Sequence, residues 1–155
     1  MGKDSIKIRG FMRGQLVDAK TGKIVGDTGW GKNKILNYGL LNLANLLVGS
    51  GGVAVGYAAL GTQTASINMT ATDISHENSF VAVTTSTSGS GSATFTCSFA
   101  GSANSASLTI GSFGLFKTNS AGSLIAARTY TSSQMTTAQN FNVTHTIQFA
   151  SGTES

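Results

Sequence analysis

Apolar and polar residues alternate with a period of two along much of this chain. The alternation is clearest at Phe95, Cys97 and Phe99, which are separated by hydroxyl residues, and across residues 140–149. A β-strand turns successive side chains to opposite faces, so each of these runs has one apolar and one polar face. The pattern predicts strands that bury one face against a core.

Further strands are predicted where apolar or β-branched runs are bounded by Gly, Ser, Thr or Asn. At the start of the chain, two strand-like runs flank a turn-rich link at residues 18–22, which predicts an N-terminal β-hairpin. About eight strands result, and this number predicts a mainly β protein with an antiparallel β-sandwich or jelly roll. The predicted strands are residues 6–17, 23–30, 54–61, 80–85, 92–99, 106–116, 123–130 and 140–149.

Over residues 37–48 the period changes from two to that of a helix. Leu40, Leu43 and Leu47 recur at helical spacing. Asn37 is a suitable N-cap, and Gly49 can end the helix with a positive φ. The sequence therefore predicts one short amphipathic α-helix near residues 37–48 that lies on a sheet.

Composition narrows the class of protein further. The chain has 155 residues, 40% of them hydrophobic, which fits a single folded domain rather than a disordered chain. Cys97 is the one cysteine, so no internal disulfide or cysteine metal cluster can form. The uncharged stretches 35–72 and 78–116 are broken by Asn, Gly, Ser and Thr, so we expect no membrane span.

Basic residues concentrate near the N-terminus. Residues 1–34 contain eight of the ten Lys and Arg residues and have a net charge of +5, whereas residues 35–155 have −1. We expect residues 1–34 to form a basic arm or hairpin that packs on, or extends from, a β-sandwich body at 35–155, all within one structural domain. The charge favours an acidic partner, and the expected contact residues are Lys7, Arg9, Phe11 and Arg13. A solvated basic strand face is the alternative interpretation.

Few residues are suited to catalysis or to metal binding. Asp73, His76 and Glu77 form the only local acid and imidazole cluster, and we interpret it as a polar surface turn rather than a metal or acid–base site. His145 lies on the apolar face of its strand, which predicts a core histidine with a buried hydrogen bond. Cys97 is predicted to be an inward-facing, unreactive thiol. We therefore expect no catalytic residue, no metal and no cofactor, and a protein that is not an enzyme.

Aromatic residues lie among the basic ones, and this pattern raises the possibility of nucleic-acid binding. Phe11 and Trp30 are interleaved with cations, and such aromatics can stack on bases. The excess charge is modest, and both rings are equally suited to a core. Nucleic acid is therefore a disfavoured partner.

Several short motifs follow one another in an order that resembles small structural proteins of tailed-bacteriophage virions. In that family an "ALGTG" strand precedes a short acidic segment, an "xxGLF" strand, an "LLART" strand and a closing β-strand, after an opening module with a Thr-Gly-Lys turn. The corresponding segments here are residues 57–62 (YAALGT), 73–77, 111–116 (GSFGLF), 124–129 (LIAART), the final alternating strand, and in the opening module residues 21–23, Asn37 and residues 39–41.

The resemblance implies a non-enzymatic structural component of a bacteriophage virion, first of all a decoration or auxiliary protein that binds and stabilises the capsid surface. A tail-associated protein (tail tube, fibre, or receptor- or carbohydrate-binding head) is the alternative, and a small enzyme is disfavoured. The implied partners are the major capsid protein or other virion proteins and further copies of this chain, with a trimer favoured. The implied location is the virion, after assembly in the host cytoplasm.

Overall fold

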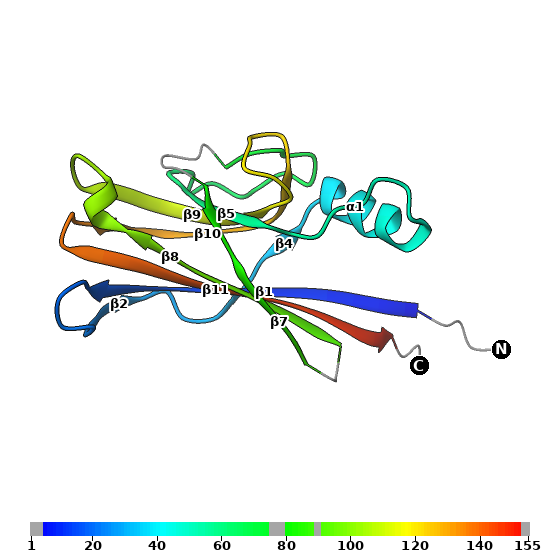
Figure 1. The fold of residues 1–155 in the computed structure, drawn as a ribbon, viewed down its shortest axis with the longest axis horizontal. Coiled ribbons are helices and arrows are strands. Elements are labelled where there is room, and N and C mark those ends of the chain that lie inside the picture. The colour runs from blue at the N-terminus through cyan, green and yellow to red at the C-terminus, as the bar shows by residue number, and fades with distance from the viewer. Residues whose placement is uncertain (1–4, 75–79, 89–90, 153–155) are drawn as a thin grey trace.

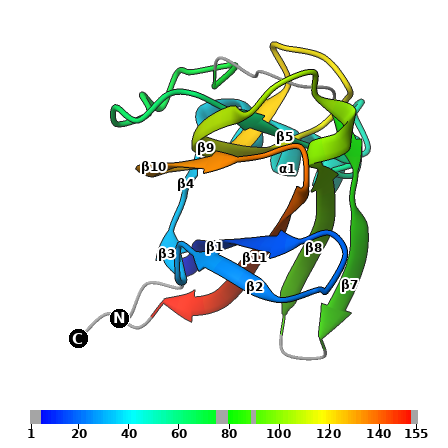
Figure 2. The same cartoon turned by 90° about the vertical axis from the view of Figure 1, so that its left-hand side faces the viewer.

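Two antiparallel β-sheets packed face to face form the protein, as the layers in Figures 1 and 2 show. The computed structural model describes residues 5–74, 80–88 and 91–152. The predicted mainly β sandwich with one helix is therefore confirmed, whereas the jelly-roll variant stays a prediction. The described strands outnumber the predicted eight, because short two-residue strands lie at the sheet edges.

Sheet A contains six strands and sheet B contains five. The order in sheet A is β2 (Ile24–Asp27), β1 (Ser5–Asp18), β11 (Gln139–Gly152), β8 (Ser92–Ala100) and β7 (Thr84–Ser88), and β3 (Gly31–Lys32) also pairs with β1. The order in sheet B is β4 (Lys34–Ile35), β10 (Leu124–Met135), β9 (Leu108–Phe116), β5 (Tyr57–Gly61) and β6 (Val81–Ala82). A 3-10 turn, Gly101–Ala103, follows β8.

The first and last strands of the chain pair along their whole length. β1 and β11 are antiparallel, with Ser5 opposite Gly152 and Asp18 opposite Gln139 (Figure 1). Met12 and Leu16 of β1 point inward and are buried, as is Phe141 of β11. The period-two pattern thus arises because one face of sheet A meets the core and the other meets solvent.

The N-terminal hairpin is confirmed and is part of sheet A. β1 pairs with β2 on one side and with β11 on the other, so it is an inner strand over that length. In the turn, an Asp18 carboxylate oxygen accepts hydrogen bonds from the Lys20 and Thr21 backbone N–H groups, each at 2.9 Å. Asp18 holds the turn because its side chain replaces a backbone acceptor.

Sheet B is apolar on both faces, which explains the almost unbroken apolar sequence of β9. Its inner face meets sheet A around Phe113, whose ring lies 5.8 Å from that of Phe141 between centroids. Its outer face carries a second buried cluster around Phe116, which Ile67 and Ile74 of the segment after β5 cover. Strands buried on both faces lose the alternating pattern.

Helix α1 (Asn37–Val48) has the predicted bounds and packs against β10 at one end of the sandwich (Figure 1). Gly49 ends it with φ 67°, as predicted. The predicted N-cap is wrong, because Leu36 holds that position without a side-chain hydrogen bond, while the Asn37 N–H donates to the Met69 carbonyl at 3.0 Å. Gly39 lets the helix approach closely, since a Cβ there would lie 2.5 Å from the Ile125 carbonyl oxygen.

Candidate functional site

The four predicted contact residues lie on one face of the molecule. Lys7, Arg9, Phe11 and Arg13 alternate with inward-facing residues of β1, so all four project from the outer face of sheet A. Lys7 and Arg9 are exposed, and Phe11 and Arg13 are half-buried. Lys32 of β3 stands opposite Phe11 and adds a further exposed cation to this face.

Arg13 differs from the other cations because an acidic residue of β2 binds it. The Arg13 Nε donates to Asp27 Oδ1 at 3.0 Å, and its Nη2 forms an ion pair with the same carboxylate. Asp27 also accepts from Gln15 Nε2 at 3.1 Å and from the Gly29 N–H at 2.8 Å. The hydrogen bond from Arg13 is the main reason that the pKa of Asp27 is lowered well below its ordinary range. The cations that stay unneutralised in this part of the described structure are therefore Lys7, Arg9 and Lys32. We call these three residues the basic row.

Neutral hydroxyl and amide side chains cover the rest of this outer face. They come from β11, β8 and β7, which continue sheet A beyond β1. The registers place them in rows across the strands. The set consists of Asn142, Thr144, Thr146, Gln148, Thr94, Thr96, Ser98, Thr84 and Ser86.

An aromatic cleft of about 340 Å³ borders the basic row. Phe11, Trp30, Thr146 and Gln148 line it. The Trp30 side chain is 52% exposed, so it belongs to the surface rather than to the core. An exposed indole beside amide and hydroxyl groups can stack on a flat ligand and bond its polar edge.

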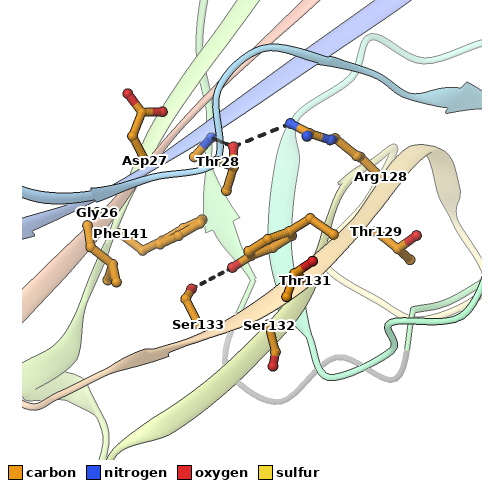
Figure 3. A pocket seen from close by; sticks show the side chains of 12 residues that line it. Gly26, Asp27, Thr28, Arg128, Thr129, Thr131, Ser132, Ser133 and Phe141 are labelled. Carbon is orange, nitrogen blue, oxygen red and sulfur yellow. Dashed lines mark hydrogen bonds between the residues drawn. The ribbon is translucent and has the colours of Figure 1, made fainter.

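A larger groove of about 530 Å³ opens between the two sheets, beside residues 128–133 of β10 (Figure 3). Its floor includes Phe141, and its rim carries the hydroxyl groups of Thr129, Thr131 and Ser132. The register of β10 against β9 shifts between Thr129 and Ser133, which marks a β-bulge at this rim. These features make the groove a polar recess with an aromatic base.

Arg128 closes one end of the inter-sheet groove by joining sheet B to sheet A. Its Nη1 donates to the carbonyl oxygens of Met12 and Gly29, both at 2.8 Å. It also donates to Thr28 Oγ1 at 3.3 Å, as a dashed line in Figure 3 shows. Gly31 allows this approach, since a Cβ there would lie 2.3 Å from the Arg128 Cζ. Burial lowers the Arg128 pKa, yet an arginine stays charged in proteins. The sequence offered no signal for this role, because two of the partners are backbone atoms about a hundred positions away.

Two hydroxyl groups of the groove, those of Tyr130 and Ser133, are hydrogen-bonded to each other. Tyr130 Oη lies 2.8 Å from Ser133 Oγ, and burial is the main cause of a raised Tyr130 pKa. Nucleophilic serines are activated by a neighbouring base such as histidine. In the described structure Ser133 is bonded to a phenol instead, so this pair orders the bulge.

His145 is a core residue, as predicted, but its predicted hydrogen bond is wrong. The side chain is fully buried, and neither ring nitrogen has a hydrogen-bond partner among the described residues. Apolar side chains surround it, because Met12 and Phe95 flank it in the sheet and the Phe113 ring packs on it edge-on at 5.9 Å. Burial lowers its pKa to about 3.

The remaining predicted chemistry is only partly covered by the described residues. Burial raises the pKa of the Cys97 thiol to about 12, as expected for an inert cysteine. Asp73 is half-buried, whereas His76 and Glu77 lie outside the described residues. Within residues 5–74, 80–88 and 91–152, no group of three His, Cys, Asp or Glu side chains could hold a metal ion. None of the helices found there is long and apolar enough to cross a membrane.

Helix α1 adds an exposed apolar surface. Leu47 is 89% exposed and Val48 is 75% exposed, and Leu41 and Leu46 are also exposed. The helical spacing of the leucines predicted a buried stripe, but Gly39 and Asn42 are the buried residues of the helix. The Asn42 amide is buried because it bonds the backbone of Val53 twice, at 2.8 and 3.1 Å.

Comparison with known proteins gave no match to a protein-family model, to a curated protein or to a solved structure.

Proposed function

We propose that this chain is a non-enzymatic structural component of a bacteriophage virion, a decoration or auxiliary protein that attaches to the capsid surface and stabilises it. The proposal starts from the resemblance of its motifs to virion proteins. The observation that carries it is the outer face of sheet A, where the basic row borders a broad neutral surface. Such a face fits a neighbouring protein whose surface is acidic at one side and neutral at the other.

The outer face of sheet A is formed by paired strands and does not depend on a partner for its hydrogen bonds. β1 is hydrogen-bonded to β11 over its full length, and the Arg13–Asp27 pair ties β1 to β2. A preorganised surface loses little conformational freedom on binding, so more of the contact energy appears as affinity. The exposed cations of the basic row would steer the encounter, while the neutral rows would form most of the contact area.

Attachment to particles tests this proposal. Purified chain would be added to particles of the encoding phage assembled without it, and binding would be followed at low salt and at about 0.15 M salt, where the Debye length is roughly 8 Å. The double variant Lys7→Ser and Arg9→Ser should associate about tenfold more slowly at low salt, because steering typically contributes tenfold or more to association. Lys20→Ser with Lys23→Ser is the matched control, since these exposed cations lie at the hairpin turn, and it should associate normally.

The result against the proposal is equally clear. If the parent chain fails to attach to such particles, the proposed decoration role is wrong. If the Lys7 and Arg9 variant attaches as fast and as fully as the parent, the basic row does not mediate attachment. Cryo-microscopy of the saturated particle gives a second readout, because a decoration protein occupies regular positions on the capsid lattice.

A tail-associated, carbohydrate-binding protein is the second candidate, and the aromatic cleft is the observation that favours it. The exposed Trp30 and the half-buried Phe11 lie beside Gln148 and Thr146, an arrangement suited to stacking on a sugar ring and bonding its hydroxyls. In this case a few copies would lie at the tail tip. Trp30→Ala would then abolish adsorption to host cells and leave incorporation of the chain into the particle unchanged.

A further inference from the structure

The hydrogen-bonding edge of β1 is occupied over only part of the strand. On the side away from β11, β2 pairs with Gln15 to Val17 and β3 pairs with Phe11 and Met12. The last contact on this side is the hydrogen bond from the Asn33 N–H to the Gly10 carbonyl at 3.0 Å. The chain then leaves sheet A for β4 in sheet B. In the described structure, no strand lies beside Ser5 to Arg9 on this edge.

The backbone groups of Ile8 point toward this open edge. The carbonyls of Gly10 and Gly14 accept hydrogen bonds from Asn33 and Thr28 on the β2 and β3 side. In an antiparallel ladder, alternate residues direct both their N–H and C=O groups to the same neighbour. The even-numbered residues of β1 therefore face this side, so the N–H and C=O of Ile8, and those of Ile6, are available to a further strand.

A groove of about 510 Å³ runs along the open edge between β1 and helix α1. Ile8, Ile35 and Leu40 form its apolar wall, and Arg9, Lys32 and Asn33 form its polar wall. Leu40 is 42% exposed. Both amide atoms of Asn33 are buried without a hydrogen-bond partner in the described structure. We call this recess the edge groove.

We infer that the edge groove binds an extended segment of another virion protein, which adds to sheet A as a strand beside Ser5 to Arg9. Strand addition combines backbone hydrogen bonds along an open edge with pockets for alternate side chains. Five residues of strand span about 16 Å, so a segment of about that length fits. This inference rests on the proposed function and names the contact through which the chain attaches.

The side chains along the groove specify the segment that would bind. Arg9 and Lys32 are on the outer face, so outward residues of the added strand would be acidic, since opposite charges on neighbouring strands attract. Its inward residues would be apolar, because they would pack against Ile8 and Leu40. The expected segment therefore alternates acidic and apolar residues.

A second copy of this chain is a poor source of such a segment. Its six acidic residues are spread over 155 positions, and no two of them are separated by a single apolar residue. The open edge of β7 is a poorer acceptor than that of β1, since β7 reads Thr-Thr-Ser-Thr-Ser and has no apolar side chain to form a wall. The groove chemistry thus points to a different protein with an acidic, extended arm.

A designed peptide tests the inference without any particle. The probe is acetyl-Ser-Glu-Val-Glu-Ile-Glu-Val-Ser-amide. Two matched controls carry N-methyl groups, one on its Glu residues and the other on its Val and Ile residues, so each lacks the backbone N–H donors of one edge. Binding would be measured by NMR titration of the full-length ¹⁵N-labelled chain. We expect saturable binding of the probe and slower hydrogen exchange of the Ile8 amide. We also expect loss of binding for the peptide whose N-methyl groups lie on the edge that would pair with β1.

Surface variants with matched controls locate the binding site. Leu40→Asp and Arg9→Glu should each weaken binding about tenfold or more, since they remove the apolar wall or reverse the charge. Leu47→Asp on the same helix and Lys20→Glu at the hairpin turn should bind within about twofold of the parent. All four residues are exposed, so the variants should fold. A peptide with Lys in place of Glu should bind Arg9→Glu better than it binds the parent.

The outcomes separate this inference from the proposed function. Absence of peptide binding, equal binding of both N-methylated peptides, or an undiminished affinity of Leu40→Asp would overturn strand addition, even if the Lys7 and Arg9 variant still attached poorly to particles. Binding of oligothymidine in place of the peptide, weakened by Arg9→Glu, would overturn it in favour of nucleic acid. Peptide binding at the groove, together with full attachment of Leu40→Asp to particles, would support the groove and contradict its role in attachment.

Discussion

Acid should destabilise this protein through one buried histidine. His145 is fully buried between Met12 and Phe95, with its ring against Phe113. Its imidazole has no hydrogen-bond partner among the described residues, so nothing there compensates a positive charge. Burial lowers the His145 pKa from its ordinary value of 6.5 to about 3, because the low-dielectric core disfavours the imidazolium.

The direction and size of the effect follow from proton binding. Above pH 6.5 His145 is neutral in both the folded and the unfolded chain, so its contribution does not change. Between pH 6.5 and about pH 3 the unfolded chain binds a proton that the folded chain excludes, so the free energy of unfolding falls by about 1.4 kcal/mol per pH unit. At pH 4.5 the loss is about 2.7 kcal/mol, which corresponds to a fall of roughly 5–10 °C in Tm for a domain of this size.

Urea unfolding at pH 7.5, 6.5, 5.5 and 4.5 measures this loss. The test variant is His145→Met, because methionine does not titrate and adapts to an apolar site of similar volume. His76→Gln is the matched control, since it removes the other histidine of the chain. Hydrogen bonds lower the pKa of Asp18 and of Asp27, so their stabilisation is present above their ordinary pKa near 4 and is lost only at lower pH.

We expect the parent and His76→Gln to lose stability together below pH 6.5, and His145→Met to keep it. At pH 7.5 the methionine variant should be at least as stable as the parent, because unpaired buried nitrogens cost about 1–3 kcal/mol. Parallel pH profiles for the parent and His145→Met, or a flat profile for His76→Gln, would refute the assignment.

Three further substitutions test how the sheets and the helix are held together. Arg128→Met should lower the free energy of unfolding by about 1–3 kcal/mol, because it leaves two half-buried carbonyls that the guanidinium had bonded; urea unfolding would show this, and a loss under 0.5 kcal/mol would contradict the role of Arg128 in joining the two sheets. Gly39→Ala should cost about 1–3 kcal/mol despite its better helix propensity, because the added Cβ meets the Ile125 carbonyl; a gain in Tm would show that the helix does not pack this closely. Asn42→Leu should cost about 2–3 kcal/mol, because the Val53 N–H and C=O both lose their partner, and amide exchange at Val53 should accelerate; unchanged exchange would contradict this account.

The strands and the helix could be predicted from the sequence because their signals are local. Phe141, Val143, His145 and Ile147 of β11 lie on one face, as their alternation with Asn and Thr predicted. The helix ends at Gly49 because glycine adopts positive φ without strain. Such patterns depend only on which face of a strand or helix is buried. The spacing of apolar residues that are close in sequence shows which face that is.

The candidate site could be predicted only in part, because it depends on contacts between distant segments. The alternation predicted that Lys7, Arg9 and Arg13 share one face of the strand. It did not indicate that Asp27 would pair with Arg13 and not with Lys7 or Arg9. That pairing follows from the β1–β2 register, which sets Gln15 opposite Asp27. The role of Arg128 could likewise not be predicted, because its two shortest hydrogen bonds go to backbone carbonyls, which every residue has.

The path of the chain explains why one half of β1 is neutralised and the other half is not. β2 runs beside the second half of β1 and brings Asp27 to Arg13, whereas after β3 the chain crosses to sheet B at Asn33, before it reaches Arg9. Within the described structure, the crossing leaves the charge of Arg9 and the backbone groups of Ile8 open on the same stretch of strand. An added strand that carries an acidic residue would neutralise the charge of Arg9 and form hydrogen bonds with the backbone of Ile8. Charge and backbone pairing would then act together, so a partner with acidic side chains but no extended segment should bind this edge more weakly than one that has both.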